Sequence, residues 1–428
     1  MLHVLLEHPS PRARWVVEHT LGRMLGLSLQ ITADADTFAR AEGPKLSYGT
    51  VPVQGAVHVP WSGALTDLPA HDPPQAKVDG MPVLFPHGGS FDLFAATFFL
   101  LALVDEQRCP ARDPHGRIPS AALFTVRSAL ADKPWVDHWV LALGDRLRQR
   151  WPALSFNRTY RHLVTVDMDN LLRYAGRPVG RALGATLKDL VQLRAGAVLE
   201  RWAVRWGLRP DPFLRAVDLA QRCTAGSAAP VLFLLLRGDG PHDHAVVPDR
   251  WTDELRTRLR GTADLRPGLH PSYATRDDAA RMAAEVALFK QHLEPRVLVS
   301  RQHFLRWHLP DTLRSLAAAG FAEEHSLGFV DRSGFRAATC TPFPWYDLEH
   351  ERATDLVLWP FAAMDSALIA QHGGKVHAVT AAMCAASDHV RAVGGTFVSV
   401  WHDRYLSGHR EFAPWPAVLE RVVKHAKA

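Results

Sequence analysis

The sequence lacks several features that would assign the chain to a specialised class of protein. Only four of its 428 residues are cysteine. They form no C-x-x-C pair and match no zinc motif or small disulfide framework: Cys109, Cys223, Cys340 and Cys384. We therefore expect reduced thiols in a cytoplasm. A dominant charge is also missing, since 49 Lys and Arg oppose 44 Asp and Glu and the arginines look scattered. This balance gives no indication of a nucleic-acid partner.

Long apolar runs are absent as well. The most apolar segment, residues 93–104, falls well short of the about 20 residues that a membrane span needs. We interpret it as a buried helix with Asp92 as its N-cap. The N-terminus has no basic segment before its short apolar run, so it does not resemble a signal peptide. These observations predict a soluble, cytoplasmic protein with no membrane span.

The length of the chain predicts more than one domain, because 428 residues exceed one ordinary core. We place the boundary where "WPALSFNRT" interrupts a helical pattern, which gives domains of residues 1–155 and 156–428. In the first domain, residues 12–25 have helical periodicity, and residues 43–61 contain short β-like runs broken by Gly and Pro. This part is predicted to be a smaller α+β domain of unknown function.

After about residue 158, short apolar runs alternate with helical segments. Strands are predicted at residues 163–166, 231–236, 297–299, 356–359 and 396–401. Helices are predicted at residues 190–206, 279–293, 312–319 and 378–393. Such repetition indicates parallel strands with helical crossovers, and its length is typical of a barrel. The predicted fold class is therefore α/β, with a (β/α) barrel in the second domain.

Polar residues that could carry chemistry stand near the ends of these apolar runs. They are Asp167, Asp169, His270, Arg301, His303, Arg336 and His402. The carboxyl ends of parallel strands open onto one face of a barrel, so we expect these distant residues to converge there. Two acids, several histidines and two arginines suit metal-assisted hydrolysis. An Asp and neutral imidazoles can hold a divalent metal. A second Asp can take a proton from water, and a His can protonate the leaving group.

Each candidate also has a structural interpretation. Asp169 could cap a helix beginning at Asn170, and His270 could occupy a turn before Pro271. The aromatic residues 343–346 could be core rather than a ligand platform. The remaining candidates could be packing or ion-pair residues: Arg301, His303, Arg336 and His402.

Seven segments of the chain form an ordered set. They are "FDLFAATFFLLALVDE", "DPHGR", "TVDMDN", "GLHPSY", "SRQHFLRW", "GFRA" and "WH". In this order they resemble the polysaccharide deacetylase superfamily, carbohydrate esterase family 4, and within it a bacterial branch with an additional N-terminal domain. The resemblance covers nearly the whole chain, and "GLHPSY" and "SRQHFL" are its most specific pieces.

The resemblance implies a distorted (β/α) barrel and metal-dependent removal of N- or O-acetyl groups from an acetylated sugar or polysaccharide precursor. By motif, Asp167 matches the general base, and Asp169 and His270 match ligands of a divalent metal, expected to be zinc. Arg301 matches the arginine that orients the base, and His402 matches the general acid. The catalytic candidates also include the arginine of the "GFRA" segment, Arg336.

The chain also departs from the family pattern. Arg266 stands four residues before His270, where the family usually has its first metal-binding histidine. We expect His303 to replace it as the third ligand. Because the histidine pair is incomplete, two alternatives stay open: a metal-independent C–N hydrolase acting on a small amide, or a catalytically degenerate barrel that binds a glycan or protein. The oligomeric state is not predicted.

Overall fold

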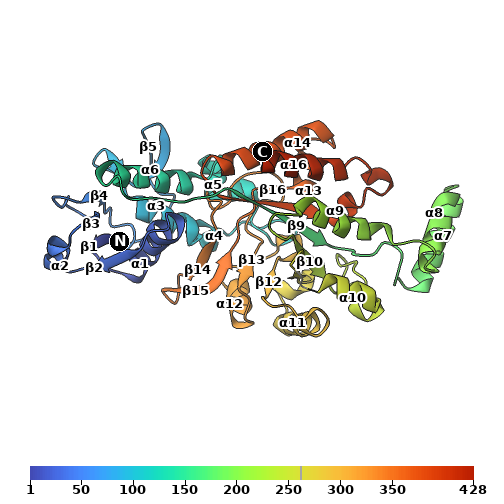
Figure 1. Cartoon of the computed structure of the whole chain (residues 1–428). Helices are drawn as coiled ribbons and strands as arrows, with labels where there is room; N and C mark the ends of the chain where they lie inside the picture. Colours follow the sequence, from blue (N-terminus) through green and yellow to red (C-terminus); the bar gives the residue numbers. More distant parts are fainter. Residues whose placement is uncertain (261–262) are drawn as a thin grey trace.

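The computed structural model of the chain describes residues 1–260 and 263–428. It contains two main sheets, a small one near the N-terminus and a larger one that occupies the centre of the molecule (Figure 1). Within the described residues, no helix is both long and apolar enough to cross a membrane.

The small sheet has four parallel strands in the order β2–β1–β3–β4. Their bounds are β1 (Leu2–Leu6), β2 (Leu29–Thr32), β3 (Lys45–Gly49) and β4 (Val57–Pro60). The first two strands were not predicted from the sequence. β1 is short, but it becomes a central strand because its leucines and Val4 are buried in the core.

Two helix predictions for this region are confirmed. Helix α1 (Pro11–Val17) is capped by Ser10 and continues as the π-helical segment η1 (Glu18–Met24). Helix α3 (Leu93–Leu101) is buried on every side, and the Asp92 carboxylate accepts a hydrogen bond from the Ala95 N–H at 2.9 Å. The other elements of the first 155 residues are α2 (Ala35–Arg40), β5 (Gln75–Val78), β6 (Met81–Leu84), β7 (Pro86–His87), β8 (Ser90–Phe91), α4 (Val104–Arg108), η2 (Ser120–Ala122), α5 (Phe124–Arg127), η3 (Leu130–Asp132) and α6 (Trp135–Arg150).

The large sheet has nine strands in the order β14–β15–β13–β12–β11–β10–β9–β17–β16. All neighbours are parallel except β14 and β15, which confirms the predicted α/β class. The bounds are β9 (Arg161–Met168), β10 (Val231–Leu235), β11 (Arg266–His270), β12 (Val299–Ser300), β13 (Glu323–Glu324), β14 (Phe343–Asp347), β15 (Arg352–Leu358), β16 (Ala363–Met364) and β17 (Thr396–His402).

The large sheet is open. Among the described residues, its edge strands β14 and β16 do not pair with each other, so no closed barrel forms. Helices α1 and α3 of the first region pack against β15 and β14 at one edge. The Trp15 ring lies 5.5 Å from the Tyr346 ring there. The aromatic residues Phe343–Tyr346 are buried at this contact, as the core interpretation of residues 343–346 predicted.

Five strands of the large sheet were predicted, and four were not. The missed strands are β11, β13, β14 and β16. β11 contains Pro267 and Gly268, which normally interrupt strands. Gly268 is required in β11, because a Cβ atom there would lie 2.6 Å from the Phe233 ring of β10. Two of the others, β13 and β16, have only two residues each, too few for an alternating pattern to appear.

The helices of the large sheet follow the predictions closely where periodicity is strong. α11 has the predicted bounds, and α12 and α14 start one or two residues earlier. The predicted helix 190–206 is instead two helices, because the chain turns at Leu193 with φ 53°. The helical elements are α7 (Val179–Val191), α8 (Ala195–Arg205), η4 (Pro212–Leu214), α9 (Arg215–Thr224), η5 (Pro248–Arg250), α10 (Asp253–Leu259), η6 (Tyr273–Arg276), α11 (Ala279–Leu293), η7 (His303–Leu305), α12 (Asp311–Ala318), α13 (Asp365–Gln371), α14 (Val376–Arg391), α15 (Asp403–Leu406), η8 (Arg410–Phe412) and α16 (Pro416–Lys427).

Candidate metal centre and active site

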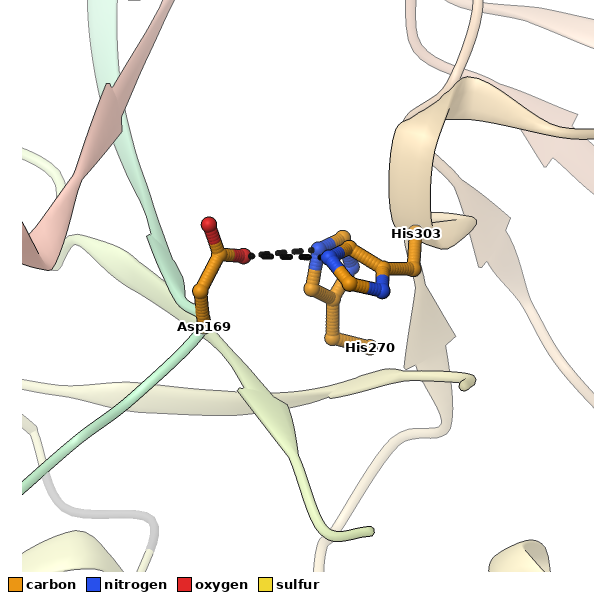
Figure 2. Close-up of side chains that lie close together, drawn as sticks. All are labelled: Asp169, His270 and His303. Carbon is orange, nitrogen blue, oxygen red and sulfur yellow. Dashed lines mark ion pairs between the residues drawn. The ribbon is translucent and has the colours of Figure 1, made fainter. Parts of the chain in front are cut away.

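Three predicted metal ligands converge at the carboxyl ends of neighbouring strands (Figure 2). Asp169 directly follows β9, His270 ends β11, and His303 follows β12. The Asp169 Oδ1 atom lies 3.4 Å from His270 Nε2 and 3.7 Å from His303 Nε2. One ligand atom from each residue lies within 4.8 Å of the other two. The parallel register of β9, β10, β11 and β12 therefore builds the cluster that the sequence predicted.

The geometry of this cluster fits a metal ion. Ligand atoms around a tetrahedral zinc, with bonds of about 2.1 Å, lie ~3.4 Å apart. The two contacts of Asp169 are close to that separation. In the described structure, Asp169 Oδ1 is buried and has no hydrogen-bond partner, which is costly for a carboxylate oxygen unless a cation or proton satisfies it.

The Nδ1 atom of each histidine ring donates a hydrogen bond, and this bond fixes the orientation of the ring. His270 Nδ1 donates to the Arg301 carbonyl oxygen at 2.5 Å. His303 Nδ1 donates to Asp243 Oδ1 at 2.9 Å. With Nδ1 protonated, the Nε2 lone pairs of both rings face Asp169. This is the outer-shell arrangement that fixes the tautomer of metal-binding histidines in other proteins.

The electrostatics of the cluster favour a cation. Burial raises the pKa of Asp169, but the His270 contact and the nearby His402 and His303 rings outweigh burial and hold that pKa far below its usual range. Burial lowers the pKa of His270, yet the charges of Asp167 and Asp169 raise it overall. The same negative potential that attracts a proton to this position attracts a divalent cation.

The turn that carries His303 has a strained backbone. Phe304 and Leu305 adopt φ angles of 60° and 53°, which non-glycine residues rarely do. Arg117, from the first region of the chain, donates to the Phe304 carbonyl at 3.0 Å and forms an ion pair with Asp113. The predicted polar loop Asp113–Arg117 thus holds the turn that directs His303 toward Asp169.

The second acid, Asp167, is held by a buried arginine. Arg301 Nη1 donates to Asp167 Oδ1 at 2.7 Å, and Nη2 donates to Thr165 Oγ1 at 2.9 Å. Arg301 Nε donates to the His325 carbonyl at 3.0 Å, and the guanidinium lies 4.4 Å from the Phe233 ring centroid. All three nitrogen atoms of the Arg301 guanidinium donate hydrogen bonds, so Arg301 is held in place and fixes the position of Asp167.

His402, at the end of β17, lies opposite this carboxylate in register with Asp167. Its Nδ1 donates to Asp365 Oδ1 at 2.6 Å, and its backbone N–H donates to Asp365 Oδ2 at 2.8 Å. Burial lowers the pKa of His402, but the Asp365 charge and hydrogen bond, together with Asp169, raise it to about 9. His402 is therefore a protonated imidazole at neutral pH.

These residues line one cavity of about 180 Å³. Six of the seven predicted residues are at this place: Asp167, Asp169, His270, His303 and His402 line the cavity, and Arg301 contacts Asp167. Arg336 does not line it. Arg336 instead forms a two-pronged ion pair with Glu106 of α4, at 2.8 and 2.6 Å, and donates to the Gly328 carbonyl. Arg336 is therefore an ion-pair residue, as one of the two interpretations of the sequence expected.

Four site residues were missed by the sequence reasoning: Asp243, Asp365, Arg117 and Arg404. Asp243 lies between two histidines in the loop after β10, and Asp365 follows β16. Both are acids near strand ends, the same signal that selected Asp167. Arg404 Nη1 lies 3.7 Å from Asp169 Oδ2. The alternative interpretation of Asp169 as a helix cap is wrong, because no described helix begins at Asn170 and the N–H groups of Asn170 and Leu171 donate to Asp403.

Comparisons with other proteins cover the chain unevenly. A family model described as "Family of unknown function (DUF7033)" matches residues 2–152. No curated protein matches the chain. A solved structure from Mycobacterium smegmatis, described as a candidate polysaccharide deacetylase, is similar with a TM-score of 0.39 and 16% identity. That similarity covers 63% of this chain and 85% of the other chain. At this TM-score the likeness assigns no activity.

Proposed function

We propose that the chain is a metal-dependent hydrolase that removes N- or O-acetyl groups from a carbohydrate, with a deacetylase-like α/β domain over residues 156–428. The observation that carries this proposal is the oriented cluster of Asp169, His270 and His303, whose ligand atoms lie within 4.8 Å of one another. A base and an acid line the same cavity beside it. The resemblance of the sequence motifs to polysaccharide deacetylases supplies the substrate class, an acetylated sugar or polysaccharide precursor.

Asp169, His270 and His303 would hold the metal, and zinc suits one carboxylate and two neutral imidazoles. A bound divalent metal would polarise the acetyl carbonyl and acidify water in the cavity. Asp243 and the Arg301 carbonyl keep the two imidazoles in the tautomer that this role needs.

Asp167 acts as the general base in this proposal. Its carboxylate accepts a proton from the water that attacks the acetyl carbonyl carbon. Arg301 holds the Asp167 carboxylate in position beside the cavity through the 2.7 Å hydrogen bond. Because Arg301 contacts Asp167 and not the cavity, it is a positioning residue.

His402 acts as the general acid. Its Nε2 atom donates a proton to the leaving amine or alkoxide of the sugar, so that the bond to the acetyl group breaks without releasing a strong base. Asp365 keeps the ring protonated at neutral pH and fixes its orientation. The base and the acid thus have opposite protonation states, as one proton acceptor and one proton donor require.

The proposal is tested with the purified full chain. Metal content is measured by elemental analysis, and acetate release is measured with acetylated amino-sugar oligomers before and after chelation. We expect about one divalent ion per chain and turnover that is lost on chelation and restored by zinc. His303→Ala should lose metal and turnover together, whereas the matched control His308→Ala, a half-buried histidine nearby in sequence that contacts Asp311, should retain both.

Two results would redirect the assignment. Full turnover in chelator, with loss in Asp167→Asn, would identify a metal-independent amide hydrolase. Metal binding without turnover on any acylated sugar would identify a binding protein with a degenerate site.

A further inference from the structure

A second cavity, of about 250 Å³, adjoins the candidate site and is lined by arginines. It lies between the loop that follows β9 and the helices α7 and α8. Four arginines contribute to its wall: Arg173, Arg177, Arg181 and Arg201. None of the described residues that line it is an acid. Asn170, next to the metal-ligand candidate Asp169, lines this cavity too.

Among the described residues, only one arginine of this cavity forms an ion pair with a carboxylate. Arg201 forms a buried ion pair with Asp189. Arg177 donates only to backbone carbonyls, those of Leu172 and His244. Burial, together with the neighbouring Arg181, lowers the pKa of Arg177 to about 10.

Two of the four arginines are free to bind a ligand. The guanidinium of Arg173 lies over the rings of Tyr174 and Phe213, which offer no counter-ion. Neither Arg173 nor Arg181 donates a side-chain hydrogen bond to any residue that the structure describes. A cavity with this wall selects an anion, and guanidinium groups bind phosphate in particular.

The same two helices expose an apolar ridge. Of the twelve large apolar side chains that are exposed in the described chain, nine lie between residues 179 and 208, each 53–92% exposed. They are Val179, Leu183, Leu187, Leu190, Val191, Leu193, Leu199, Trp206 and Leu208. Val179, Leu183 and Leu187 recur every fourth residue, so they form one stripe along α7. Figure 1 shows α7 and α8 standing away from the rest of the molecule.

The charge of this segment indicates what covers the ridge. Residues 171–209 contain eight Lys or Arg and two acids, a net +6, whereas the whole chain is +5. This segment is thus more basic than the chain as a whole. The core of a protein interface is depleted of charge, whereas an anionic lipid leaflet accepts apolar side chains and cations together. A second copy of the chain would bring two +6 segments together across a twofold axis, which repulsion disfavours.

We propose that the α7–α8 hairpin docks on an anionic lipid surface, with its apolar ridge in the leaflet and the basic side chains of residues 171–209 near the headgroup phosphates. This inference does not depend on the proposed hydrolase activity.

The test is sedimentation of the full chain with vesicles of phosphatidylcholine, with and without phosphatidylglycerol. We expect at least roughly tenfold tighter binding to the anionic vesicles, weakened by salt. Leu183→Ser/Leu187→Ser should abolish binding, and Arg173→Gln/Arg181→Gln should remove the preference for the anionic lipid. The matched controls are exposed residues elsewhere, Val51→Ser/Val297→Ser and Arg40→Gln/Arg421→Gln, which should bind as the wild type does.

Several results would overturn the proposal. One is equal sedimentation with and without phosphatidylglycerol, and another is unchanged binding of the leucine variant. Self-association that the leucine variant loses, without vesicle binding, would assign the ridge to a second copy of the chain instead. Stabilisation by inorganic phosphate without vesicle binding would assign the cavity to a free anion. Because the mutated leucines are exposed, thermal melting should be unchanged, and Asp167→Asn should bind vesicles normally whether or not the chain is a hydrolase.

Discussion

Two buried Asp–Arg pairs, Asp167–Arg301 and Asp137–Arg158, differ in how many hydrogen bonds their carboxylates accept. The Asp167–Arg301 pair is 2.7 Å apart and the Asp137–Arg158 pair 2.6 Å apart. Both oxygens of Asp137 are saturated, because Arg158, two threonine hydroxyls and the Cys340 N–H all donate to them. Asp167 lines the cavity and keeps capacity to accept a further proton. A buried Asp–Arg pair is therefore no sign of chemistry by itself, and Asp167 differs from Asp137 in the cavity that it lines.

The largest effect expected is on turnover in Asp167→Asn. The amide can still accept the hydrogen bond from Arg301, but it cannot take a proton from water. We expect kcat to fall about 10²–10⁴-fold, with metal content and melting temperature close to those of the wild type. Steady-state kinetics of acetate release measure this. A kcat within tenfold of the wild type would mean that Asp167 is as structural as Asp137.

The next effect is on metal affinity in Asp243→Ala. Loss of the carboxylate frees His303 Nδ1, so the ring is no longer fixed with Nε2 toward Asp169. We expect affinity to fall about 10–100-fold in competition with a chelator. Asp249→Ala is the matched control, since Asp249 also lies beside a histidine, His292, at 3.6 Å but does not line the cavity. Equal losses in both variants would contradict the orienting role.

The pH profile gives the third test. With a pKa of about 9, His402 stays protonated until the pH rises through that value, so kcat/KM should fall above it. Asp365→Asn removes the charge that raises this pKa, and the fall should then begin at least roughly one pH unit lower. The free energy of unfolding should also decrease as the pH rises, as kcat/KM does. The raised pKa stabilises the fold fully below pH 6.5, and the contribution is lost as the pH rises through about 9. An unmoved alkaline limb would rule out His402 as the titrating acid.

The smallest effect on turnover is expected at the Asp137–Arg158 pair. Asp137→Ala leaves the Arg158 guanidinium without its counter-ion, and we expect a loss of about 3–5 kcal/mol in unfolding free energy. Turnover per folded molecule should stay within roughly twofold of the wild type. Urea unfolding measures the loss of stability, and kinetics on the same sample measure turnover. Lost turnover at unchanged stability would mean that the pair acts on the site.

The sequence predicted five of the nine strands of the large sheet and six residues that lie at or beside the candidate site, but it missed four other residues there. Helix α11 has the predicted bounds because its apolar residues repeat on one face and Asp278 caps it. Six of the seven chosen residues reach the cavity or its direct contacts, since parallel strands bring their carboxyl ends to one edge. Arg336 was chosen together with Arg301, but it faces Glu106. Arg301 follows the predicted strand at residues 297–299, whereas no predicted strand ends near Arg336.

The amino-acid sequence by itself determined the alternation of strands and helices and the two acids at the end of β9. Both depend on local periodicity and on neighbours in the chain. Only the tertiary structure decided that the sheet is open among the described residues, that Asp243 and Asp365 orient His303 and His402, and that four arginines line one cavity. These features depend on contacts between residues tens to hundreds of positions apart, which folding creates and which no local pattern encodes.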